Sequence, residues 1–358
     1  MLKQQSPIDI LAGLILLGCL VWLILDNLGR DKETSTDNGN QDNQEPDSEY
    51  NPVVSTANEI KPESTLPIEL DSSTQGTEEQ RDEQSSPSDR VKGEIKDGVE
   101  LRALDDYPVE IRRFQIPKQG LTEAECEDKS ALSSSEGRLR VAVADGATES
   151  LFSDIWAELI VNSYIEKGAE LFNIGSLQSL TQAFLHTASK LILQMPETRH
   201  WFMYEKLERG SHATFVAAEF YNPETMEVLA VGDSCIFWRN EENGNVEMLP
   251  ELSAEDFGVF PASICSLQKT WQNLESKIVK QEVNLQNGFQ VILCTDALAC
   301  WLVKELKKDL FIWEKLFKLS DSISFTNFIE SLRSQKEIRN DDVTLVLIHA
   351  IPINVRLQ

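Results

Sequence analysis

The pattern of apolar and polar positions divides the chain into three regions. Residues 10–25 form an uninterrupted apolar and glycine run. Residues 26–100 are dominated by Asp, Glu, Ser, Thr, Asn, Gln and Pro, and from about Val99 apolar residues recur as they do in a globular domain. We therefore expect an N-terminal anchor at 1–26, a linker at 27–100 and a folded domain at 101–358.

Within the folded region, short apolar runs alternate with segments of helical periodicity. The runs of strand type are 139–144, 213–220, 228–231, 236–238, 291–294 and 343–348. Apolar faces of 3.6-residue period lie within 152–160 and 180–195, and further helices are expected at 298–306 and 325–332. The turn residues 222–224 predict an antiparallel hairpin between the second and third runs. This order of strands and helices predicts a layered α+β domain rather than a dinucleotide-binding parallel sheet.

The run at 10–25 is slightly shorter than the roughly 20 residues that a spanning helix prefers, but it is adequate once its flanks are counted. A secretory signal peptide is the alternative, although no small-residue cleavage site follows. The segment before Cys19 loosely resembles a lipoprotein attachment site, but six apolar residues follow that cysteine. We expect a retained single-pass membrane anchor. Arg30 and Lys32, together with unpaired cysteines, favour a cytoplasmic location for the folded domain.

The linker at 27–100 contains few large apolar residues, so it cannot bury enough surface to offset its chain entropy. We expect it to be disordered. A plain spacer and a regulatory tail with modifiable Ser and Thr both remain open.

Composition narrows the possible partners. The 358 residues include 59 Asp and Glu against 33 Lys and Arg, for a formal net charge of −26. A surface this acidic repels phosphate backbones, so a role in binding nucleic acid is not expected. The six cysteines form no CxxC pair, and we expect them to be structural rather than zinc ligands.

Acidic residues stand at the ends of three predicted strands. Asp145 follows the first run, Asp296 follows the fifth, and Asp341 and Asp342 precede the sixth. The ordinary role of a single Asp at a strand end is a turn or a helix cap. If the last strand runs antiparallel to the other two, however, all of these carboxylates gather at one edge of the sheet.

Carboxylates packed this closely repel one another unless a cation holds them. Glu127 and Asp128 can join the same group. Hard divalent ions such as Mg²⁺ or Mn²⁺ prefer oxygen ligands of this kind. Two such ions sharing a carboxylate would activate a water for attack on a phosphorus centre.

At these residues the chain resembles the protein phosphatase 2C (PPM-type) family, and especially its divergent bacterial branch. The motifs appear in family order over about residues 109–351. They are Glu127-Asp128, Val143-Ala144-Asp145-Gly146, Gly210-Ser211-His212-Ala213-Thr214, Val231-Gly232-Asp233-Ser234, Leu293-Cys294-Thr295-Asp296 and Asn340-Asp341-Asp342-Val343-Thr344.

The resemblance implies a four-layer αββα sandwich, in which two antiparallel sheets are flanked by helices. It also implies two Mn²⁺ or Mg²⁺ ions, with the catalytic role assigned to Asp145 and Asp296. The implied metal ligands are Asp145 bridging both ions, the Gly146 carbonyl, Asp296 and Asp341 at the first ion, and Glu127 and Asp128 at the second, directly or through water. Asp233 is expected to shape a turn rather than to bind metal.

The sequence departs from the family pattern at two functional positions. Glu123 stands where many members carry a phosphate-binding Arg, and Lys118 and Lys129 are the nearby cations. Neither lysine can form the two-pronged contact of an arginine. Ala147 stands where many members carry a His that is a candidate general acid, so we expect a slower reaction.

The function predicted on this basis is metal-dependent hydrolysis of phosphoserine and phosphothreonine in proteins, by a monomer. Two alternatives follow from the missing Arg. One is a pseudophosphatase that binds phosphoproteins without hydrolysing them, and the other is a phosphohydrolase for small molecules. Metal binding without hydrolysis would indicate the first, and a preference for small phosphomonoesters would indicate the second.

Overall fold

The computed structural model describes residues 95–96, 99–104, 107–135, 137–239, 244–258, 260–285 and 288–351. The expected anchor at 1–26 and almost all of the expected linker at 27–100 lie outside these residues. Within the described ranges, no helix combines the length and the apolar character needed to cross a bilayer.

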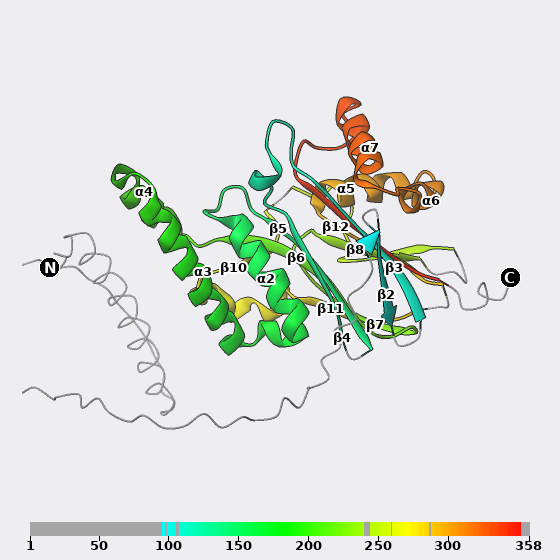
Figure 1. The fold of residues 1–358 in the computed structure, drawn as a ribbon, viewed down its shortest axis with the longest axis horizontal. Coiled ribbons are helices and arrows are strands. Elements are labelled where there is room, and N and C mark those ends of the chain that lie inside the picture. Colours follow the sequence, from blue (N-terminus) through cyan, green and yellow to red (C-terminus); the bar gives the residue numbers. More distant parts are fainter. Residues whose placement is uncertain are drawn as a thin grey trace, which may run out of the picture. The chain divides into compact units, whose positions relative to one another are not determined.

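Two antiparallel sheets form the centre of the described domain (Figure 1). Sheet A has the strand order β1 (Ile95–Lys96), β2 (Val99–Leu104), β3 (Tyr107–Ile116), β13 (Val343–Ala350), β12 (Gln290–Cys294), β8 (Cys235–Arg239) and β9 (Val246–Leu249). Sheet B has the order β11 (Val279–Asn284), β7 (Thr225–Val231), β6 (His212–Asn222), β5 (Arg138–Gly146) and β4 (Lys129–Ser135). The short strand β10 (Ile264–Cys265) also pairs with β6.

Helices cover the outer faces of both sheets. Sheet B is covered by α2 (Ser153–Lys167), α3 (Ile174–Gln194) and α4 (Glu197–Leu207), and sheet A by α5 (Asp296–Leu306), α6 (Phe311–Phe317) and α7 (Ser322–Ser334). Short 3-10 turns are η1 (Glu123–Glu125), η2 (Gly168–Phe172), η3 (Gln268–Asn273) and η4 (Glu275–Lys277). The four layers predicted from the sequence are confirmed.

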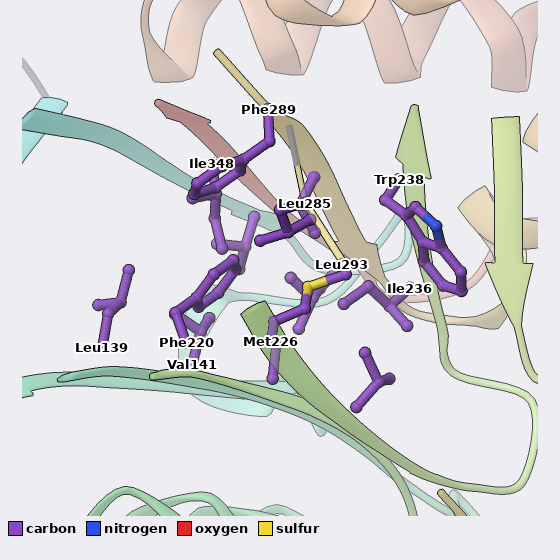
Figure 2. Packing of buried hydrophobic residues seen from close by; sticks show 14 of the residues in the cluster. Leu139, Val141, Phe220, Met226, Ile236, Trp238, Leu285, Phe289, Leu293 and Ile348 are labelled. Carbon is purple, nitrogen blue, oxygen red and sulfur yellow. The ribbon is translucent and has the colours of Figure 1, made fainter. Parts of the chain in front are cut away.

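One of three hydrophobic clusters among the described residues lies between the two sheets (Figure 2). Successive side chains of a strand point to opposite faces, so Val141 and Val143 of β5 enter this core, whereas Ala142 and Ala144 pack with the helices over sheet B. Across the gap, the rings of Phe220 and Phe289 stack with their centroids 5.4 Å apart. Burial on both faces explains why β5 reads as a continuous apolar run instead of an alternating one.

All six predicted strand runs lie within strands, and the predicted helices correspond to α2, α3, α5 and α7. The hairpin of β6 and β7 turns at residues 223–224, as expected. One expectation about the sheet is wrong. Strand β5 belongs to sheet B, whereas β12 and β13 belong to sheet A, so the acidic residues that follow and precede these strands do not share one edge of one sheet.

Candidate functional site

The strand registers bring the acidic segments to one end of the sandwich. In sheet B, the end of β5 lies beside the starts of β4 and β6. In sheet A, the end of β12 lies beside the starts of β8 and β13, and the end of β3 lies beside the start of β13. The loops that connect these ends carry most of the residues predicted for the site. The site therefore combines carboxylates from the loops of two sheets rather than of one.

Asp145, the last residue but one of β5, lies among four other carboxylates. Its charge interacts with those of Asp128, Asp233, Asp296 and Asp341. Burial, and then repulsion from these neighbours, raise the pKa of Asp145 well above its ordinary value. The cluster unites most of the predicted metal ligands around the residue that was predicted to bridge them.

Asp128, the residue directly before β4, is completely buried. The Thr295 hydroxyl donates to Asp128 Oδ2 at 2.9 Å and accepts from the Thr344 amide at 2.9 Å, which links the carboxylate to sheet A. Asp128 Oδ1 has no hydrogen-bond partner among the described residues. Burial and the neighbouring Asp342 raise the pKa of Asp128.

Glu127 is surrounded by donors. Thr148 donates to Oε2 and Ser153 to Oε1, each at 2.6 Å, and the Lys118 ammonium lies 3.3 Å from Oε2. The approach of Ser153 depends on Gly146, because a Cβ at residue 146 would lie only 2.8 Å from the Ser153 backbone. Both carboxylate oxygens of Glu127 are thus engaged by protein donors.

Asp296 and Asp341 share a cation that the sequence analysis did not identify. The Arg339 guanidinium donates to Asp296 Oδ2, and Arg339 Nε lies 3.2 Å from Asp341 Oδ2. Asp296 is the first residue of α5, and its Oδ1 atom is buried without a partner in the described structure. Burial and the Asp296 charge raise the pKa of Asp341.

Asp342 connects the two sides of the site. Its carboxylate accepts hydrogen bonds from the backbone amides of Lys118 and Glu127, both at 2.8 Å. These bonds tie the start of β13 to the segments after β3 and before β4. Asp342 therefore positions the loops that carry the other residues.

Asp233 lies in the turn between β7 and β8, as expected, but it also faces the cluster. Gly232 has φ +97°, and a Cβ there would lie 2.4 Å from the Ala262 carbonyl oxygen, so only glycine fits this turn. Asp233 is buried, and its Oδ1 has no partner in the described part of the chain. Burial and the charge of Asp296 raise the pKa of Asp233 to about 7.

Of the two lysines near the position of the missing Arg, one enters the site. Lys118 is within ion-pair distance of Glu127 and Asp341, and its side chain is 19% exposed. Its burial lowers the pKa, but the charges of Glu127, Asp342 and Asp341 outweigh that effect and raise it. Lys129 instead donates to the Cys126 carbonyl at 2.6 Å, and Glu123 lies exposed in η1.

The chemistry of the cluster fits a hard divalent cation. Buried oxygens of Asp128, Asp233 and Asp296 lack partners among the described residues, and an unpartnered buried carboxylate oxygen is costly unless a cation binds it. Among the described residues, no group of three or more His, Cys, Asp or Glu side chains is arranged so that it could hold a metal ion. Arg339 and the donors around Glu127 occupy oxygens that a metal ion would use.

Comparison with known proteins identifies one family. Residues 121–340 match the family described as Protein phosphatase 2C. Among curated proteins, no sequence matches the chain significantly.

Several solved structures are similar. RsbX in complex with magnesium is 16% identical, with 71% of this chain and 100% of that chain covered and a TM-score of 0.41. The catalytic domain of the serine threonine protein phosphatase PstP with two manganese ions is 17% identical, with 68% and 99% covered and a TM-score of 0.43. The serine/threonine phosphatase Stp1 from Staphylococcus aureus is 14% identical, with 67% and 94% covered and a TM-score of 0.44.

The raised pKa of Asp233 predicts how pH affects the stability of the metal-free protein. Between about pH 4 and about pH 7, folded Asp233 retains a proton that the unfolded chain has lost. Raising the pH through this window therefore destabilises the fold, by up to about 1.4 kcal/mol per pH unit. Asp233→Asn cannot ionise, so its free energy of unfolding should increasingly exceed that of the wild type as the pH rises.

Urea unfolding in the presence of chelator, at several pH values between about 5 and 8, measures this difference. Asp309→Asn, at an exposed aspartate outside the cluster, is the matched control and should run parallel to the wild type. Parallel profiles for Asp233→Asn as well would show that Asp233 ionises normally.

Proposed function

The chain belongs to the protein phosphatase 2C family, and from this premise we propose that it is a metal-dependent protein serine/threonine phosphatase. Its substrates would be proteins that carry phosphoserine or phosphothreonine. The observation that carries the proposal is the group of carboxylates at one end of the sandwich, in which buried oxygens of Asp128, Asp233 and Asp296 have no partner among the described residues. Such a group is well suited to divalent cations.

The residues that would hold two Mn²⁺ or Mg²⁺ ions are those of the family resemblance. The charge of Asp145 interacts with those of Asp296, Asp341 and Asp128, so Asp145 would be the ligand shared by both ions. The Gly146 carbonyl follows Asp145 directly, and Glu127 would act through water because both of its oxygens already accept hydrogen bonds. When bound, such ions lower the pKa of a water and neutralise the charge that develops on phosphorus.

The protein's own side chains would position the metal ligands and supply positive charge for the substrate phosphate. Thr295 fixes the orientation of Asp128, and Asp342 holds the loops that carry Lys118 and Glu127. Lys118 is the cation placed to bind a phosphate oxygen, in the role that Glu123 cannot fill. It would do so as a point charge with rotatable donors, which orients a phosphate less strictly than the planar fork of arginine.

We further propose that residues 10–25 hold the protein at a membrane, with the phosphatase domain on the cytoplasmic side. The support is the apolar run itself, whose length is adequate for one span. Membrane attachment would confine the enzyme to substrates at or near that surface.

Metal-dependent phosphate release from a phosphothreonine peptide tests the central proposal. We expect release by the full-length protein with Mn²⁺ or Mg²⁺ and none with chelator. Even outer partners of metal ligands contribute about 10–100-fold, so Asp145→Asn and Asp296→Asn should each lose at least about 100-fold. Asp309→Asn should retain wild-type activity.

Three contrary results have different meanings. Stabilisation by Mn²⁺ without release in the wild type would indicate a pseudophosphatase. Faster release from small phosphomonoesters than from phosphopeptides would indicate a small-molecule phosphohydrolase. Full activity in Asp145→Asn would contradict the proposed two-metal site.

The role of Lys118 is tested by Lys118→Ala and Lys118→Arg. A hydrogen bond to a charged group contributes about 1.5–3 kcal/mol, so Lys118→Ala should lower kcat/KM by about 10–100-fold. Lys118→Arg keeps the charge and should retain most of the activity. Equal kcat/KM in Lys118→Ala and the wild type would show that Lys118 does not bind the substrate phosphate.

Membrane attachment is tested by fractionating cells that express the full-length protein. We expect it to remain in the membrane fraction after alkaline carbonate extraction, because a spanning helix is not released by loss of ionic contacts. Deletion of residues 1–26 should move the protein to the soluble fraction. Release of the full-length chain by carbonate would instead indicate peripheral association.

A further inference from the structure

Arg339 occupies a place in the site that the proposed function alone does not explain. Its guanidinium bonds Asp296 and pairs with Asp341 at 3.2 Å. These are the two carboxylates assigned to one of the ions. The guanidinium takes Asp296 Oδ2 and Asp341 Oδ2, one of the two oxygens that each carboxylate could offer to a metal ion.

The backbone around Arg339 is held on both sides. The Asn340 side-chain oxygen accepts a hydrogen bond from the Gln119 backbone amide at 2.8 Å, and the Asp341 backbone carbonyl accepts one from the Arg333 side chain at 2.6 Å. Before Arg339, the Ile338 side chain is buried in the core beneath sheet A. These contacts hold the neighbours of Arg339, so rotation of its own side chain is enough to move the guanidinium.

The side chain has space to move away. It is 45% exposed, and it lines a cavity of about 210 Å³ together with Phe257, Cys300, Trp301 and Glu337. The cavity lining also includes one carboxylate, Glu337, and one ammonium, Lys304. The guanidinium can therefore leave the carboxylate pair for the space on the cavity side without movement of the backbone.

Pairing of Arg339 with Asp296 and Asp341 is favoured when no metal is present. Within the described residues, Lys118 and Arg339 are the cations in contact with the cluster, against the charges of Asp128, Asp145, Asp233, Asp296 and Asp341. One positive charge reduces the repulsion between Asp296 and Asp341. A divalent ion at the same oxygens would bring twice that charge and would be repelled by the guanidinium beside it.

We propose that Arg339 is a tethered counter-ion that competes with a divalent metal ion for Asp296 and Asp341. Loading of this half of the site then requires Arg339 to leave the carboxylate pair for the cavity side. The arginine stabilises the metal-free protein and sets the metal concentration at which the site fills. This inference rests on the proposed metal-dependent function, but it concerns metal affinity and not the reaction.

Binding of Mn²⁺ to the full-length protein, followed by the electron paramagnetic resonance signal of free Mn²⁺, tests the competition. Arg339→Gln removes the charge and should bind Mn²⁺ at least about tenfold more tightly than the wild type. Arg339→Lys keeps the charge but lacks the fork, so its affinity should rise by a smaller factor. Arg209→Gln, at an exposed arginine paired with Glu205 on the protein surface, is the matched control and should match the wild type.

Thermal unfolding adds a second readout. In chelator, Arg339→Gln should have a lower Tm than the wild type, and saturating Mn²⁺ should raise its Tm by more. If Arg339→Gln does not fold, the Mn²⁺ affinity of Arg339→Lys relative to the wild type tests the proposal instead. Unchanged or weaker Mn²⁺ binding in the folded Arg339 variants, or no Mn²⁺ binding in any protein, would overturn the proposal.

Phosphopeptide hydrolysis by the same proteins separates this inference from the proposed function. Tighter Mn²⁺ binding in Arg339→Gln without hydrolysis in any protein supports the counter-ion and contradicts the phosphatase. Mn²⁺-dependent hydrolysis with equal affinities in all proteins supports the phosphatase and contradicts the counter-ion.

Discussion

Mutual repulsion among buried carboxylates is the constraint on which this end of the molecule depends. Antiparallel pairing in both sheets places the ends of β5 and β12 and the starts of β4 and β13 together. The loops there carry acidic residues, and burial removes most of the water that would screen their charges. Each carboxylate must therefore obtain hydrogen bonds, a cation or a proton. The raised pKa values of Asp145, Asp233 and Asp341 express that cost.

The protein meets this constraint in a different way at each carboxylate. Hydroxyls and an ammonium surround Glu127, and two backbone amides hold Asp342. Arg339 stands between Asp296 and Asp341. Asp128 keeps one buried oxygen without a partner in the described structure. The carboxylates of Glu127 and Asp342 are satisfied by protein donors, whereas Asp128 and Asp296 each keep a buried oxygen without a partner among the described residues.

Much of the fold was predictable because burial acts locally along a strand or helix. The six apolar runs predicted as strands, and the helical faces at 152–160 and 180–195, needed no knowledge of distant contacts. The assignment of strands to sheets, in contrast, depends on contacts between residues far apart in the sequence. Strand β5 was expected to share an edge with β12 and β13, but it lies in the other sheet, since an apolar run does not specify which partner it will pair with. Strand β3 was not predicted as an element, because its run contains Arg112 and Arg113.

The sequence by itself determined the layered α+β class and the motifs of the family, and it indicated which carboxylates would meet. These properties follow from residue type, periodicity and order along the chain. Only the tertiary structure decided how each carboxylate is neutralised. Lys118 rather than Lys129 enters the site, and Arg339 pairs with Asp296 across 43 positions of sequence. Charge pairing depends on distances of a few ångströms between loops from different strands, and those distances exist only once both sheets have packed.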